Sequence, residues 1–145
     1  MGIELCDAMT RRLAEAALQA RENAYCPYSG FAVGAALLTA DGKLYTGVNI
    51  ENAAFGPTNC AERTAFFTAV AAGERDFTAI AIAGGKAGEA PKDFCAPCGV
   101  CRQVMREFCR DDFKIILAKP GAVRVYALKE LLPESFSPDH LNGQE

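Results

Sequence analysis

The spacing of apolar and polar residues predicts one helix and two strands in the first third of the chain. Apolar residues recur at near-helical spacing over residues 5–24, with charged side chains on the other faces, so an amphipathic helix should end before Pro27. Residues 31–39 form a continuous apolar run, which is typical of a strand buried on both faces. Asp41-Gly42 is the two-residue signature of a tight hairpin, so a strand at residues 44–48 should pair antiparallel with the first.

An aperiodic loop and a second helix are predicted next. The loop spans residues 49–59 and contains the breakers Gly56-Pro57, and loops in this position commonly line a site. The helix is predicted at residues 60–72, and Gly73 is its expected C-cap. A stripe of small residues for close packing is formed by Ala61, Ala65, Ala69 and Ala72.

The second half of the chain continues to alternate strands with helices. Pro97-Cys98 should open a helix whose buried side is formed by Val100, Val104 and Phe108. Strands are predicted at residues 77–83, 113–118 and 123–127, followed by a short helix at residues 128–132.

The order of these elements predicts an α/β fold with three layers, α/β/α, around a mixed five-stranded sheet. A helix lies between strands twice, and right-handed crossovers make the strands on either side of each helix parallel. The turn at residues 119–121 is too short for a crossover, so the last strand should be antiparallel to its predecessor. The loops before Cys60 and Cys98 then leave one edge of the sheet, where α/β proteins bind ligands.

Length and charge exclude several classes of protein. The 145 residues, 50% of them apolar, suit one domain, which we place at residues 1–136 and which a polar tail at residues 137–145 follows. The 15 basic and 18 acidic residues include no basic run, which argues against a nucleic-acid partner and for a small-molecule ligand. No apolar run approaches the roughly 20 residues of a membrane span, and Glu4 and Asp7 stand where a secretory signal carries positive charge. We therefore expect a cytoplasmic protein without a membrane partner.

Seven cysteines in a chain without an export signal indicate reduced thiols used as metal ligands. Cys60, Cys98 and Cys101 supply three soft ligands, which can hold a zinc ion and leave one coordination position open for catalysis. The other cysteines away from this cluster are expected to be small buried residues, namely Cys6, Cys26 and Cys109.

Cys95 leaves two other kinds of metal site open. Added to the three ligands it closes a four-cysteine structural zinc site, and its spacing to the next two cysteines resembles that of an iron–sulfur cluster. Against these, Cys95 precedes Pro97 and so lies outside the helical turn, and Cys109 is too distant for a ferredoxin-type run. The single histidine, His140, lies in the polar tail and is expected to be solvated.

Charged residues beside the cysteine ligands have two expected roles. Glu62 lies two positions after Cys60, where a carboxylate can pass protons to and from a molecule that water attacks. Three thiolates carry more negative charge than Zn²⁺ can balance, and this weakens the ion as a Lewis acid. Arg63 and Arg102 are each adjacent to a ligand and can offset that charge by donating to a sulfur, the alternative being a solvated arginine.

Two motifs around these residues resemble those of a known family. Cys60-Ala61-Glu62 and the run Pro-Cys-Gly-Val-Cys-Arg-Gln at residues 97–103 look like the zinc-dependent cytidine deaminases, specifically the small all-cysteine type that forms homotetramers. Segments at residues 27–31, 49–55 and 131–136 resemble further motifs of the family. The resemblance implies the same mixed five-stranded sheet between helices, one zinc ion per chain on the three cysteines, and Glu62 as the proton shuttle.

The resemblance also implies a nucleoside site shared between subunits. Asn49 and Glu51 would bind the ribose hydroxyl, and Phe31 would stack on the pyrimidine. Phe136, and Phe55 with it, would reach across to a neighbouring subunit of the tetramer. Phe55 stands where many members have tyrosine.

The implied reaction is the hydrolytic deamination of cytidine and 2′-deoxycytidine to uridine and 2′-deoxyuridine with release of ammonia, a step of pyrimidine salvage. One alternative is an aminonucleoside-antibiotic deaminase of the blasticidin S type, which shares the zinc motif but lacks the Asn49-Ile50-Glu51-Asn52 loop. The other alternative is a non-catalytic zinc or iron–sulfur binding module.

Overall fold

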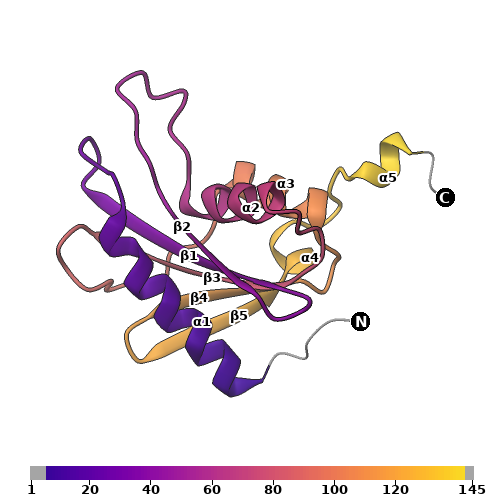
Figure 1. Ribbon diagram of the computed structural model, residues 1–145, viewed down its shortest axis with the longest axis horizontal. Coiled ribbons are helices and arrows are strands. Elements are labelled where there is room, and N and C mark those ends of the chain that lie inside the picture. Colours follow the sequence, from indigo (N-terminus) through magenta and orange to yellow (C-terminus); the bar gives the residue numbers. More distant parts are fainter. Residues whose placement is uncertain (1–5, 143–145) are drawn as a thin grey trace.

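The computed structural model describes residues 6–142, and its helices and strands follow the predicted order (Figure 1). Residues 1–5 and 143–145 lie outside the described residues, and they include Glu4 and Leu5, on which two of the predictions drew. Helix α1 begins at Asp7. The elements in chain order are α1 (Asp7–Ala20), the 3₁₀ turn η1 (Arg21–Asn23), β1 (Phe31–Thr39), β2 (Leu44–Val48), α2 (Ala61–Ala71), β3 (Phe77–Lys86), α3 (Gly99–Phe108), β4 (Lys114–Lys119), β5 (Ala122–Ala127), α4 (Leu128–Leu131) and α5 (Pro138–Leu141).

The five strands form one mixed sheet in the order β2-β1-β3-β4-β5. Strand β1 pairs antiparallel with both β2 and β3, so β2 and β3, which flank α2, run in the same direction. Strands β3 and β4, which flank α3, are parallel neighbours, and β5 returns antiparallel to β4. The predicted hairpin, parallel crossovers and final antiparallel strand are all confirmed.

Helices cover both faces of this sheet, which confirms the three layers (Figure 1). Successive residues of β1 alternate between two hydrophobic clusters, with Ala35 and Leu37 in one and Ala36 and Leu38 in the other. Both faces of β1 are therefore buried, which explains its continuous run of apolar residues. Helix α1 covers the second cluster, whereas α2 and α3 cover the first, which is the larger of the two.

Helix α2 lies close to the sheet because β2 carries a glycine beneath it. A Cβ on Gly47 would lie only 2.4 Å from the carbonyl oxygen of Ala61 and 2.4 Å from the amide nitrogen of Ala65. Ala61, Ala65 and Ala69 are buried on this side of the helix, so three of the four stripe positions are confirmed, whereas Ala72 is exposed. This close contact fixes the position of the helix whose first turn carries Glu62.

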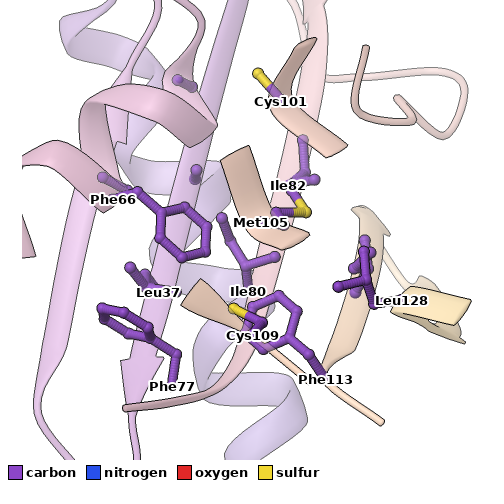
Figure 2. Packing of buried hydrophobic residues seen from close by; sticks show 14 of the residues in the cluster. Leu37, Phe66, Phe77, Ile80, Ile82, Cys101, Met105, Cys109, Phe113 and Leu128 are labelled. Carbon is purple, nitrogen blue, oxygen red and sulfur yellow. The ribbon is translucent and has the colours of Figure 1, made fainter. Parts of the chain in front are cut away.

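The predicted buried side of α3 was wrong at Val100. Val100 is 58% exposed, whereas Cys101 and Met105 face the sheet and are 1% and 0% exposed. Neighbouring residues on a helix are rotated by about 100°, so burying Cys101 turns Val100 away from the core. Val104 and Phe108 are partly buried and pack at the margin of the cluster. Figure 2 shows Cys101 and Met105 in the packed cluster.

Other details of the sequence prediction were corrected or extended. Of the three cysteines expected in the core, only Cys109 is buried; Cys26 is partly buried and Cys6 is exposed. Gly73 follows α2 with a φ of 100°, as its predicted role as C-cap requires. A short helix, α5, forms inside the segment predicted as a polar tail. Among residues 6–142, no helix combines the length and the apolar character that crossing a membrane requires.

Candidate active site

Three cysteine sulfurs converge where helices α2 and α3 begin. Cys60 is the N-cap residue of α2 and Cys98 is the N-cap residue of α3, and Cys101 lies in the first turn of α3. Their Sγ atoms all lie within 4.8 Å of one another, and those of Cys60 and Cys98 are 3.8 Å apart. The sequence prediction that these three residues form one cluster is confirmed.

The geometry of this cluster fits a zinc ion. Tetrahedral coordination with Zn–S bonds of about 2.3 Å places two sulfur ligands about 3.8 Å apart, which is the separation of the Cys60 and Cys98 sulfurs. The sulfurs also lie at two helix N-termini, where backbone N–H groups and the helix dipoles favour thiolates. Three protein ligands leave one tetrahedral position free, as catalytic zinc sites do.

Glu62 lies beside this cluster and is almost completely buried. Its side chain is in the first turn of α2, and the residue is 4% exposed. Loss of solvation, with a smaller contribution from the neighbouring charge on Cys60, raises the pKa of this carboxyl from 4.5 to about 7. A carboxyl group with a pKa near neutrality both accepts and releases protons readily at neutral pH.

Arg63 is the arginine that contacts the metal ligands. Its Nη2 atom donates to Sγ of Cys60 over 3.1 Å, so the guanidinium lies where it can offset thiolate charge. Arg102 is different, because its Nε and Nη1 atoms donate to the carbonyl oxygens of Pro97 and Leu131, each over 2.8 Å. Arg102 therefore ties the coil before Cys98 to helix α4.

The protonation of the cysteines follows from these contacts. A hydrogen bond from the Cys101 thiol, together with the Arg63 guanidinium, lowers the pKa of Cys60 to about 5. The pKa of Cys101 is raised, chiefly because its proton is shared with the Cys60 sulfur and also because the residue is buried. Both Arg63 and the Cys101 thiol thus favour a thiolate at Cys60.

Cys95 lies outside the cluster of converging sulfurs. It is not among the residues within 4.8 Å of one another, and it packs instead against Gly84, where the ring of Phe31 also lies. Burial, with smaller contributions from the charges of Glu62 and Cys60, raises the pKa of the Cys95 thiol to about 11. Because the Cys95 sulfur lies apart from the other three, this geometry disfavours the closed four-cysteine site.

Asn49 and Glu51, the polar residues expected to bind a sugar, lie in the loop that follows β2. The Oδ1 atom of Asn49 accepts from the amide of Val33, and its Nδ2 atom donates to the carbonyl oxygen of Phe31. Glu51 accepts hydrogen bonds from the amides of Tyr28 and Ser29 and from the Ser29 hydroxyl. Both side chains are thus fixed in place against the start of β1.

The turn at Tyr28-Ser29 was not assigned a function from the sequence. Its two amides and its hydroxyl all point at the Glu51 carboxylate, whose pKa is lowered chiefly by the Ser29 hydroxyl. The signal available in the sequence was a serine in a turn, a residue that commonly donates to nearby acceptors. Nothing in the sequence indicated that the acceptor would lie 22 positions away.

The aromatic residues expected at the site are exposed. Phe31, Phe55 and Phe136 are 43%, 69% and 56% exposed. Phe55 has a φ of 64° and contacts Tyr28 edge to face, with ring centroids 5.9 Å apart. Phe136 lies near the start of α5, which stands apart from the three layers (Figure 1).

Comparison with known proteins places this site in a family. Residues 8–117 match the family model for the cytidine and deoxycytidylate deaminase zinc-binding region. A cytidine deaminase of Halalkalibacterium halodurans is 49% identical over 131 residues, which cover 90% of this chain and 96% of that protein. A cytidine deaminase of Mycobacterium tuberculosis is 39% identical over 125 residues, covering 86% of this chain and 87% of that protein.

Solved structures agree with these sequence matches. The crystal structure of cytidine deaminase from Burkholderia pseudomallei has a TM-score of 0.80 and 50% identity, covering 87% of this chain and 98% of that one. The cytidine deaminase structure from Mycobacterium tuberculosis has a TM-score of 0.74 and 36% identity, covering 91% and 98%. The chain therefore belongs to the cytidine and deoxycytidylate deaminase family, which binds zinc.

Proposed function

We propose that this protein hydrolyses cytidine and 2′-deoxycytidine to uridine and 2′-deoxyuridine with release of ammonia. The observation that carries the proposal is the burial of Glu62 beside three converging cysteine sulfurs. Hydrolytic enzymes commonly combine a buried acid–base group with a metal site that has one open coordination position. The relatives named cytidine deaminase support cytidine as the substrate.

The residues of the site divide the chemistry between them. Cys60, Cys98 and Cys101 would hold one zinc ion per chain, and zinc bound there supplies a Lewis acid that makes water a stronger nucleophile. Glu62 takes a proton from the attacking water and delivers it to ring nitrogen N3 of the base. Once the water oxygen is bonded to C4 of the base, Glu62 takes the proton of the new hydroxyl group and passes it to the amine. The C4–N bond then breaks and ammonia leaves, so one buried carboxyl serves both halves of the reaction. Arg63 holds the Cys60 sulfur and offsets part of the thiolate charge.

The nucleoside is held by the loop that follows β2 and by the start of β1. Glu51 uses three hydrogen bonds to the 28–29 turn, which leaves its carboxylate a further lone pair for a sugar hydroxyl. Asn49 likewise retains one Nδ2 hydrogen and one Oδ1 lone pair beyond its two backbone contacts. Phe31, whose side chain is partly exposed, supplies an apolar surface for the pyrimidine.

The active unit in this proposal is a cytoplasmic homotetramer of the 1–136 domain that acts in pyrimidine salvage. Phe55 and Phe136 leave more than half of their surface exposed, although both belong to segments that resemble motifs of the family. Burial against a neighbouring subunit would cover these rings and close the site around the nucleoside. In that arrangement Phe136, and Phe55 with it, serve the active site of the adjacent chain.

A substrate panel tests the proposal. The zinc-loaded protein is incubated with cytidine, 2′-deoxycytidine, free cytosine and blasticidin S, and both the deaminated product and ammonia are measured. Cytidine and 2′-deoxycytidine should be converted, whereas cytosine, which lacks the sugar, should have a much lower kcat/KM because Asn49 and Glu51 gain no partner. Protein stripped of metal with a chelator is the matched control. Equal kcat/KM for cytosine and cytidine, or preferred turnover of blasticidin S, would contradict the assignment.

A further inference from the structure

The only histidine of the chain lies against Phe136. The rings of Phe136 and His140 are stacked, with centroids 5.1 Å apart and an angle of 15° between their planes. Phe136 is 56% exposed and His140 is also exposed, so this stack is not a consequence of general core packing. An exposed phenylalanine without a neighbour samples several rotamers, whereas a parallel aromatic partner favours one of them.

Hydrogen bonds fix both partners of this stack. Nδ1 of His140 accepts from the amide of Ser137 over 3.1 Å, which holds the imidazole across the first turn of α5. Nε2 of Gln103 donates to the carbonyl oxygen of Phe136 over 2.9 Å. Gln103 is in α3, two residues after Cys101. The backbone of Phe136 is therefore anchored to the helix that carries two of the cysteines, and its ring is anchored to α5.

We propose that His140 is a positioning residue: it holds the Phe136 ring in the orientation that meets the nucleoside. The inference rests on the proposed function, in which Phe136 closes the substrate site. His140 acts only through Phe136 and touches neither the metal ligands nor Glu62. Because ordering the Phe136 ring before substrate arrives lowers the entropy lost on binding, removal of His140 should weaken substrate binding without slowing the chemistry.

Three substitutions of the same residue separate the stack from the hydrogen bond. His140→Ala removes both, His140→Phe keeps a flat ring for stacking, and His140→Asn keeps an acceptor for the Ser137 amide without the ring. We expect His140→Ala to raise KM for cytidine about two- to tenfold, the range expected for the loss of an aromatic pair, with kcat within about twofold. His140→Phe should restore KM to near the parent value, whereas His140→Asn should resemble His140→Ala.

A double-mutant cycle with Phe136→Ala tests whether His140 acts through that ring. Once the ring is absent, His140→Ala should cause no further rise in KM. A rise of the same size in both backgrounds, or rescue by asparagine but not by phenylalanine, would overturn the inference. So would an unchanged KM in His140→Ala. Thermal unfolding of each variant checks that the fold is intact, which we expect because α5 contributes no buried residue.

The same measurements distinguish failure of this inference from failure of the proposed function. If Phe136→Ala itself leaves KM and kcat unchanged, Phe136 does not contact the substrate, and the proposed role of His140 is wrong as well. If Phe136→Ala raises KM but His140→Ala does not, only the inference about His140 is wrong. Deamination of cytidine by the parent protein is tested independently of both variants.

Discussion

The proposed active site has two parts that differ in how they are built. The catalytic centre, which we define as Cys60, Glu62, Cys98 and Cys101, is carried by the first turns of two helices that pack on the sheet. The aromatic rim, which we define as Phe31, Phe55 and Phe136, is made of rings that are 43–69% exposed. One part is thus held by a core within the chain, whereas the other faces outward.

This difference separates the chemistry from the binding of substrate. The raised pKa of Glu62 depends on burial, so the proton carrier must be surrounded by its own chain before any ligand arrives. The rim has no such requirement, and its exposed rings can be completed by a ligand and by a second chain. Changes in the catalytic centre should therefore abolish turnover, whereas changes in the rim should mainly weaken binding.

The largest effect is expected from removing a metal ligand. Cys98→Ala should lose both zinc and activity, because two remaining sulfurs cannot hold the ion tightly. Cys95→Ser is the matched control, since Cys95 lies three positions away but outside the sulfur cluster, and it should keep zinc and activity. Metal analysis of the purified variants checks both outcomes. Loss of zinc in Cys95→Ser would mean that the site is the closed four-cysteine type.

A second effect concerns the stability of the metal-free protein. The pKa of Glu62 is 4.5 when solvated and about 7 in the fold, so between these values the folded chain binds more protons than the unfolded chain. The free energy of unfolding should therefore fall as the pH rises through this interval, by roughly 3 kcal/mol in total. Glu62→Gln cannot ionise and should lack this contribution.

Denaturant titrations of the two metal-free proteins at pH 4.5 and pH 8 measure this difference. Cys60 also titrates in the interval, because its pKa is lowered to about 5, and it acts in the opposite direction. The comparison between parent and Glu62→Gln removes most of that contribution, since both proteins contain Cys60. An identical pH dependence in the two proteins would show that Glu62 is solvated.

A smaller effect is expected from the rim, and it can be reversed by mixing chains. Phe136→Ala should lower kcat/KM about 5- to 150-fold, as expected when an aromatic platform for a base is removed. When this variant exchanges subunits with inactive Glu62→Gln, some sites will combine an intact Glu62 with an intact Phe136 from another chain. Activity should then exceed that of either variant alone. No recovery despite demonstrated exchange would refute a shared site.

Much of the catalytic centre could be predicted from the sequence because its signals are local. Cys98 and Cys101 are three residues apart on one helical turn, and Glu62 follows Cys60 by two positions. The alternation of strands and helices, with right-handed crossovers, placed both helix starts at one sheet edge, where the structure brings the sulfurs together. The contact between Arg63 and Cys60 was one of two open alternatives, because adjacency in sequence cannot show where a guanidinium points.

The remaining contacts could not be predicted because they join distant segments. The Tyr28-Ser29 turn meets Glu51, Gln103 meets Phe136, and neither pairing has a sequence period. Val100 was misassigned because the sequence analysis treated Cys101 only as a candidate ligand, yet in the structure Cys101 occupies the side of α3 that faces the core. The burial of Cys101 thus rotates α3 relative to the orientation that its apolar residues had predicted.

Turnover of cytidine by the Glu62→Gln variant tests the central claim most directly. Parent and variant are first shown to contain one zinc ion per chain and to unfold at similar temperatures, and the release of uridine and ammonia is then followed. Glutamine cannot exchange a proton as glutamate does, and each assisted proton transfer contributes about 10²- to 10⁴-fold to the rate. We predict that the variant keeps its zinc and its fold and loses several orders of magnitude in kcat. A kcat within tenfold of the parent would contradict the assignment of Glu62 as the proton carrier.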